Sequence, residues 1–193
     1  MNKKRLGILF GLVVVVLAVG AIAVGRVLKY GFSAHDEPTA LEVIAARTAR
    51  KLATPERVAH LRNPLPQTPE NLAQGMEFWA TSCAVCHANN GSGRTTIGRN
   101  IYPKAPDMRL SATQNLSDGE LYYTIMNGIR LTAMPAWGAP ASEGQPDENN
   151  ENLWRLVQFI RHLPQLTPDE ERQMKRMNPR VPEDASSNSS GSR

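Results

Sequence analysis

The chain has 193 residues, enough for one modest domain with additional segments. It carries 22 Lys and Arg against 18 Asp and Glu, a formal net charge of +4. Four of the basic residues, Lys3, Lys4, Arg5 and Arg26, flank an apolar segment, and without them the charges balance at 18 each. Because no basic patch with interleaved aromatic residues is left, the composition argues against nucleic-acid binding.

The segment Leu6 to Val24 is continuously apolar and uncharged. Its 19 residues form a helix of roughly 28 Å, about the thickness of a bilayer's hydrocarbon core. Residues 1–28 are therefore predicted to be a single-pass transmembrane anchor. The Lys and Arg residues before it place the N-terminus in the cytoplasm and the rest of the chain on the periplasmic side of the inner membrane. A cleaved signal peptide is the alternative, with residues 21–23 (AIA) as its cleavage site.

Residues 29–68 are predicted to connect this anchor to the main domain. Leu41, Ile44 and Leu52 recur at helical spacing and predict a short juxtamembrane helix. The stretch 62–70 contains three prolines, which is typical of a stiff linker.

The main domain is predicted to be all-α and to span residues 69–163. Its first helix begins after a Thr68 N-cap and runs to about Ser82, and a second begins at a capping box formed by Ser117 and Glu120. An amphipathic helix over residues 148–163 ends the domain. The long irregular segments between these helices indicate a large cofactor around which the loops fold.

Residues 164–193 follow the main domain and contain few apolar side chains. The sequence Thr167-Pro168 predicts the start of one more, polar helix. The Ser-rich residues 181–193 are predicted to be disordered, because they have no apolar content with which to form a core.

Residues 83–87 read CAVCH and contain both cysteines of the chain. A redox dithiol of the thioredoxin type would follow a strand in an α/β domain, whereas this motif follows a helix. A structural zinc site needs four ligands, and the chain has no second paired motif. The spacing C-x-x-C-H is the signature of c-type haem attachment, in which Cys83 and Cys86 form thioethers and His87 coordinates the iron.

Methionine is the usual second axial ligand of electron-transfer cytochromes. Met134 lies 47 residues after His87 in an irregular loop, where Pro135 fixes the backbone and Gly138 permits a turn. Met108, which is 21 residues from His87 and directly precedes an arginine, is the alternative. We therefore predict His87 and Met134 as the metal ligands.

With the CAVCH motif and the Met-Pro loop, residues 69–163 resemble a class I (monohaem) c-type cytochrome in a membrane-anchored bacterial form. The resemblance implies a cytochrome c fold, with three to five helices around one covalently bound haem c. In that family a glycine and an aromatic residue of the first helix pack across the last helix. The corresponding positions here are Gly75 and Trp79, with Leu156 and Phe159 as their partners.

The resemblance also implies contacts around the haem. A proline carbonyl accepts a hydrogen bond from the ligand histidine in this family, and Pro106 and Pro103 are both candidates. The candidate hydrogen-bond donors to the haem propionates are Arg130, Trp137, Arg94, Arg99 and Tyr102.

The function implied is one-electron transfer between redox proteins, by iron that cycles between Fe(II) and Fe(III), without an enzymatic activity of its own. Because His87 and Met134 occupy both axial positions, a substrate finds no open coordination site. One alternative is a fixed haem subunit of a periplasmic dehydrogenase or terminal oxidase. The other is a haem sensor or peroxidase in which Met134 dissociates.

Overall fold

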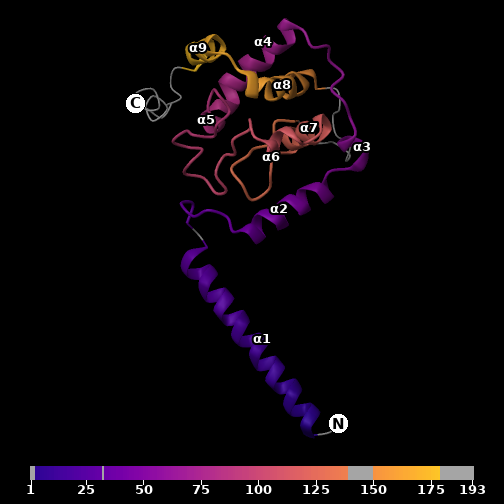
Figure 1. Cartoon of the computed structure of the whole chain (residues 1–193), viewed down its shortest axis with the longest axis vertical. Helices are drawn as coiled ribbons and strands as arrows, with labels where there is room; N and C mark the ends of the chain where they lie inside the picture. The colour runs from indigo at the N-terminus through magenta and orange to yellow at the C-terminus, as the bar shows by residue number, and fades with distance from the viewer. Residues whose placement is uncertain (1–2, 32, 139–149, 179–193) are drawn as a thin grey trace, which may run out of the picture. The chain divides into compact units, whose positions relative to one another are not determined.

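The computed structural model describes most of the chain, and its described residues are 3–31, 33–138 and 150–178. All of its regular elements are helices, with no strand in these ranges (Figure 1). The all-α prediction is therefore confirmed. The Ser-rich tail at 181–193 and the residues 139–149 before α8 lie outside the described residues.

The chain divides into two compact units, Met1–Asp36 and Glu37–Arg193. The first contains α1 (Lys3–Tyr30), in which the stretch Lys4–Lys29 is long and apolar enough to cross a membrane. None of its most apolar window is buried within the protein. A membrane anchor and a signal sequence both have an apolar helix of this kind near the N-terminus.

The second unit contains short helices joined by irregular segments. They are α2 (Ala40–Ala53), α3 (Glu56–Ala59), α4 (Pro69–Phe78), the π-helix η1 (Trp79–Cys83), α5 (Ala84–His87), α6 (Ser111–Gln114), α7 (Asp118–Asn127), α8 (Glu151–His162), the 3-10 helix η3 (Leu163–Gln165) and α9 (Pro168–Met177).

Side-chain caps account for the starts of several of these helices. At α7 the Ser117 hydroxyl accepts a hydrogen bond from the Glu120 N–H at 3.0 Å, and the Glu120 carboxylate accepts one from the Ser117 N–H at 2.7 Å. This is the predicted capping box. A second one, between Thr167 and Glu170, begins α9. Each box satisfies two backbone donors that the first turn of a helix leaves unpaired.

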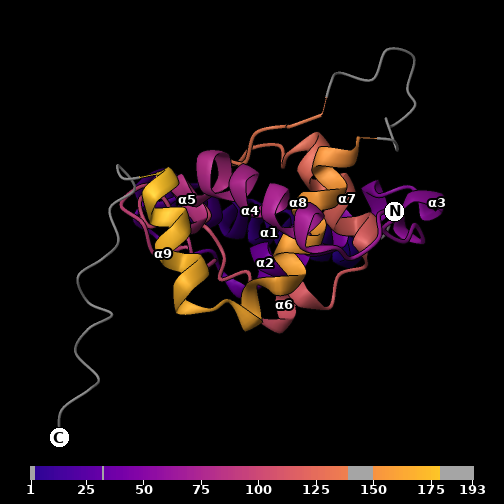
Figure 2. The same ribbon diagram turned by 90° about the horizontal axis from the view of Figure 1, so that it is seen from above.

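The core forms where α4 crosses α8 (Figures 1 and 2). Gly75 allows this close approach, because a Cβ at that position would collide with the carbonyl oxygen of Arg155. Trp79 and Phe159 are both fully buried, with ring centroids 5.8 Å apart. Leu156 is buried in the same cluster. The predicted packing of the first helix against the last is confirmed.

Helix α7 completes the core through a stack of the Tyr122 and Trp154 rings, whose centroids are 4.1 Å apart. Arg161 then ties α8 to the segment before α7. Its guanidinium donates to the Gln114 carbonyl at 2.7 Å, to the Leu116 carbonyl and to the Asp118 carboxylate at 2.9 Å.

The proline-containing stretch predicted as a stiff linker packs along the surface of α8. The Asn63 side chain donates to the Trp154 carbonyl at 2.8 Å. The Gln158 side chain donates to the Leu65 and Pro66 carbonyls at 2.9 and 3.2 Å. This segment is therefore held on the domain by hydrogen bonds from side chains to backbone carbonyls. Its amino-acid composition does not predict these contacts.

Candidate haem site

The CAVCH motif lies where the first core helix changes its winding. Helix α4 continues into the π-helix η1, and α5 then forms one α-helical turn that ends at His87. The sequence predicted one regular helix through Ser82, so the π-helix is a correction. Single π turns occur mostly within α-helices and frequently at functional sites. Cys83 is buried and Cys86 half-buried on this turn.

The two thiols lie in an apolar environment. Burial, with a smaller contribution from Cys86, raises the pKa of the Cys83 thiol to about 12. Burial also raises the pKa of Cys86. Dithiol oxidoreductases lower the pKa of the attacking thiol, because the thiolate is the nucleophile. The environment of Cys83 and Cys86 raises the thiol pKa instead of lowering it. It therefore does not support the interpretation of CAVCH as a redox dithiol.

The ring of His87 has one buried edge. Its Nδ1 atom is buried and has no hydrogen-bond partner that meets the usual geometry among the described residues. Burial lowers the pKa of His87 to about 4, against a smaller raising effect of the nearby Pro106 carbonyl. The imidazole is therefore neutral at pH 7, the form that binds a metal. The structure brings the carbonyl of Pro106 to this ring.

Trp79 supports the backbone that follows His87. Its indole N–H donates to the carbonyls of Ala88 and Asn89 at 3.1 and 3.2 Å. Ala88 has a φ of 64°, which is uncommon for a residue with a Cβ and costs free energy unless neighbouring contacts maintain it. The Trp79 ring also lies 5.7 Å from the His87 ring, centroid to centroid.

A contact from α9 also holds this segment, and the sequence did not predict it. The Asn178 side chain donates to the Ala80 carbonyl, within the π-helix, at 2.8 Å, and to the Asn89 side-chain oxygen at 2.6 Å. Met174, one helical turn earlier, is fully buried against the core. A single asparagine after a polar helix carries no sequence signal for this role.

The Met134 loop is shaped by its own hydrogen bonds. The Ile129 N–H donates to the Met134 carbonyl at 3.1 Å, and the Met134 N–H donates to the Thr132 hydroxyl at 3.1 Å. Gly128 begins the loop with a φ of 65°, and a Cβ there would meet the Met134–Ala136 backbone. Met134 itself is half-buried.

Met108, the alternative ligand, belongs to a different environment. Its side chain packs against the hydrophobic core, and its N–H donates to the Gly91 carbonyl at 2.8 Å. Packing against the core is therefore sufficient to explain the position of the Met108 side chain without a role as a ligand.

The candidate propionate donors are spread over several segments. Arg130, Arg94 and Arg99 are exposed. Trp137 packs edge-to-face on Phe78 of α4 at 5.6 Å between ring centroids. The Tyr102 hydroxyl donates to the Glu42 carboxylate of α2 at 3.2 Å.

The donor set around CAVCH fits a covalent haem better than a metal ion alone. Within the described ranges, no group of three or more His, Cys, Asp or Glu side chains is arranged to hold a metal ion. A zinc site would need such a group. A buried neutral imidazole beside two uncharged, partly buried thiols on one helical turn instead fits a large apolar cofactor.

Residues 70–160 match the family described as cytochrome C oxidase, cbb3-type, subunit III. The match begins at the second residue of α4 and ends within α8, so it covers the CAVCH turn and the Met134 loop. No curated protein matches the chain.

Proposed function

Because residues 70–160 form a c-type cytochrome domain, with haem c bound covalently, we propose that this chain is a membrane-tethered electron-transfer protein. One observation carries the proposal. The CAVCH segment forms a single turn in which a neutral His87 has a buried, unpartnered Nδ1 among the described residues. The family match over the same residues supports the interpretation of this turn as a site of haem attachment.

Each residue of the proposed site has a distinct task. Cys83 and Cys86 would hold the haem through thioethers, and His87 and Met134 would be the side chains that bind its iron. The Pro106 carbonyl, which lies near the His87 ring, is the proposed acceptor for the Nδ1 proton in the haem-bound protein, and this would leave the other ring nitrogen free to coordinate. When bound, the haem supplies the Fe(II)/Fe(III) couple for one-electron transfer.

The proposed tether is α1. The basic residues 3–5 before it favour a cytoplasmic N-terminus and a periplasmic haem domain. Anchorage raises the effective concentration of the domain near membrane-bound redox partners, because diffusion is confined to the membrane surface.

Covalent attachment can be tested on the full chain purified from membranes. We expect a c-type pyridine haemochrome spectrum with one haem per chain, retained after acid-acetone extraction. A spectrum without the c-type band, or haem lost to the solvent, would disprove the proposal.

The second axial ligand can be tested with a matched pair of variants. Met134→Ala should abolish the weak near-infrared band of methionine-ligated Fe(III), because the sulfur ligand is removed. Met108→Ala should keep this band, since Met108 packs in the core. The reverse result would assign the ligand to Met108.

A second candidate function is a fixed haem subunit of a larger oxidoreductase. The observation in its favour is the family description itself, which names a subunit of an oxidase. The chemistry at the iron would be the same, but the partner would be permanent. Co-purification with a stable complex in mild detergent at constant stoichiometry would support this function, whereas a haem protein that elutes alone would support a free carrier.

A further inference from the structure

Helix α2 presents an apolar stripe that the described part of the protein leaves uncovered. Leu41, Ile44 and Leu52 are 75%, 62% and 82% exposed, and no residue of α2, all of which is described, is buried. At 3.6 residues per turn these three side chains lie on one face of the helix, with Ala45 and Thr48 between them.

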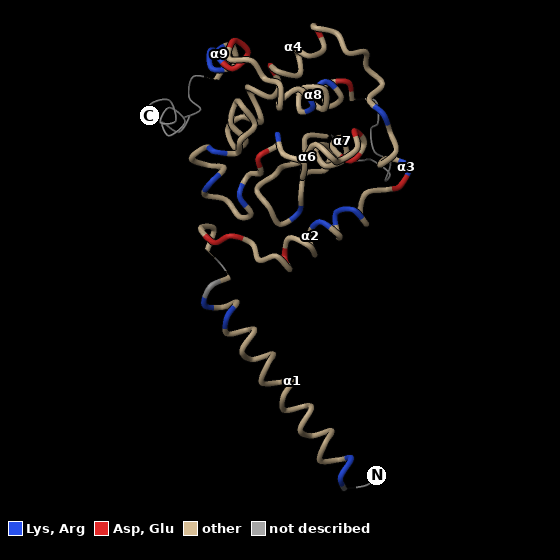
Figure 3. The backbone as a smooth tube through the Cα atoms, viewed as in Figure 1, with Lys and Arg blue, Asp and Glu red and all other residues tan. Residues whose placement is uncertain are grey.

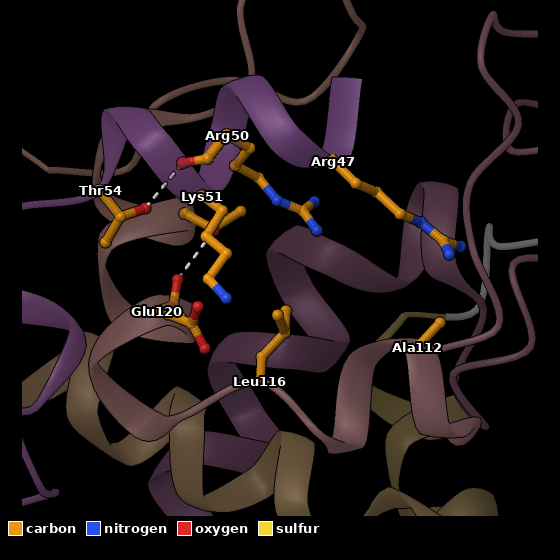
Figure 4. A pocket seen from close by; sticks show the side chains of 8 residues that line it. Arg47, Arg50, Lys51, Thr54, Ala112, Leu116 and Glu120 are labelled. Carbon is orange, nitrogen blue, oxygen red and sulfur yellow. Dashed lines mark hydrogen bonds between the residues drawn. The ribbon is translucent and has the colours of Figure 1, made fainter. Parts of the chain in front are cut away.

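The other side of α2 faces the domain. Arg47, Arg50 and Lys51 line a pocket together with Leu116 and Glu120, and Lys51 extends toward Glu120 (Figure 4). Arg50 lies roughly 180° around the helix from Leu41. The two half-buried residues of α2, Val43 and Arg50, lie on this side of the helix, whereas the stripe of Leu41, Ile44 and Leu52 lies on the other side.

Two contacts hold α2 in this orientation. The Tyr102 hydroxyl donates to the Glu42 carboxylate at 3.2 Å. Thr54, directly after the helix, is buried and so fixes the end of α2 on the domain, whereas its hydroxyl bond to the Arg50 carbonyl at 3.0 Å is local to the helix end. These contacts keep the stripe of Leu41, Ile44 and Leu52 turned away from the domain.

We propose that α2 lies on the surface of an anionic phospholipid bilayer, with its stripe inserted between head groups and acyl chains. This inference rests on the proposed anchorage by α1. Only residues 31–39 separate the end of α1 from the start of α2. Nine residues extend at most about 32 Å, so α2 cannot leave the neighbourhood of the membrane that holds α1.

The charge of α2 favours this occupant. Its sequence contains Arg47, Arg50 and Lys51 against Glu42, a net charge of +2, and Figure 3 shows the basic residues in its second half. An amphipathic helix with an apolar stripe and basic residues on its polar side is typical of helices that bind anionic membrane surfaces.

The test uses the full chain in nanodiscs of phosphatidylcholine with about one quarter phosphatidylglycerol. A photoreactive p-benzoylphenylalanine replaces Ile44 or Leu52 on the stripe, or Ala46 or Ala53 on the flank, where both alanines are exposed. We expect roughly fivefold more lipid adduct, measured by mass spectrometry, at the stripe positions than at the flank positions. Replacing the anionic lipid by phosphatidylcholine should lower the adduct at the stripe.

A probe at a fifth position tests the membrane anchorage by α1 independently of the membrane contact proposed for α2. The same probe at Leu17, within α1, should give lipid adduct whenever α1 spans the bilayer. Adduct at Leu17 with equal labelling at the stripe and the flank would overturn the inference and leave the anchorage intact. Absence of adduct at Leu17 would overturn both. A haemochrome assay on the same samples reports the haem separately.

Discussion

Helices α2 and α8 begin with side-chain caps and have amphipathic sequences of similar length, yet their surroundings differ completely. Of the 12 residues of α8, seven are buried, including Leu156 and Phe159. None of the 14 residues of α2 is buried. The difference shows that amphipathic periodicity predicts a helix and an apolar face, but not what covers that face.

The two helices also use their charged residues differently. Arg161 of α8 is half-buried and is tied to backbone carbonyls and to the Asp118 carboxylate. Arg47 and Lys51 of α2 extend over a shallow pocket and are exposed. The polar groups of α8 thus contribute to the fold, whereas those of α2 orient an otherwise uncovered surface.

Truncation of an apolar side chain should separate the two helices most clearly. Phe159→Ala should lower the free energy of unfolding by about 3–5 kcal/mol, because it opens a cavity beside Trp79 and Gly75. Leu52→Ala on α2 should change it by less than about 0.5 kcal/mol in detergent, since Leu52 is exposed. Denaturant titration followed by circular dichroism measures both. Equal losses would show that α2 is covered by protein.

Removal of a side-chain amide should give the next largest effect. Asn178→Ala leaves the Ala80 carbonyl without its side-chain donor and should cost about 1–3 kcal/mol. Asn127→Ala is the matched control, because its amide donates to the Tyr123 carbonyl at an exposed site. We expect less than about 0.5 kcal/mol for the control in the same titration. No difference between the variants would remove Asn178 from the support of the π-helix.

The capping boxes allow the same chemistry to be compared in the two settings. Ser117→Ala on α7 should cost about 1–2 kcal/mol, because the Ser117 hydroxyl also donates to the Ala59 carbonyl at 2.6 Å. Helix α2 begins with a capping box between Thr39 and Glu42. Thr39→Ala, which removes the hydroxyl of this box, should cost about 0.5 kcal/mol, since an exposed helix can fray without disturbing the core. Hydrogen exchange should show faster exchange of α2 amides in Thr39→Ala and of core amides in Ser117→Ala. Core exchange changed by Thr39→Ala would contradict this separation.

The smallest effect concerns the titration of Glu42. The Thr39 hydroxyl and then the Thr39 N–H lower the pKa of Glu42 against a smaller effect of burial, and the Tyr102 hydroxyl adds to the lowering. Because the folded pKa is below the unfolded one, the box stabilises α2 above the unfolded pKa. This stabilisation is lost as the pH falls through the folded pKa.

Carboxyl carbon NMR shifts can follow this titration. Thr39→Ala should return the pKa of Glu42 toward 4.5, and Tyr102→Phe should raise it less. A larger pKa shift in Tyr102→Phe than in Thr39→Ala would instead show that the contact of Glu42 with Tyr102 is the main determinant of the Glu42 pKa.

The sequence predicted much of the fold because its signals are local. Ser117 with Glu120 and Thr167 with Pro168 mark helix starts through bonds formed within one turn. Gly75 and Phe159 were predicted through resemblance to a family, and their contact is confirmed. The CAVCH spacing likewise pointed to the cofactor without any knowledge of tertiary structure.

The remaining features depend on contacts between residues far apart in the chain. The π-helix at Trp79–Cys83 has no distinct sequence signature, and its partner Asn178 is nearly 100 residues away from Ala80. The packing of the 62–68 segment on Gln158 depends on backbone carbonyls, which every residue has. Neither contact could be inferred from residue types and spacing.

The Asn178 contact has a consequence for the order of assembly. A ribosome makes the CAVCH segment long before it makes residue 178, so the Ala80 carbonyl has no side-chain donor during that interval. The backbone of the CAVCH motif is therefore less constrained early in synthesis. The Asn178 contact can restrain it only after α9 has been made and has packed on the domain. A chain truncated before residue 164 would lack α9 and Asn178. Its haem-binding turn would therefore lack the hydrogen bond to the Ala80 carbonyl.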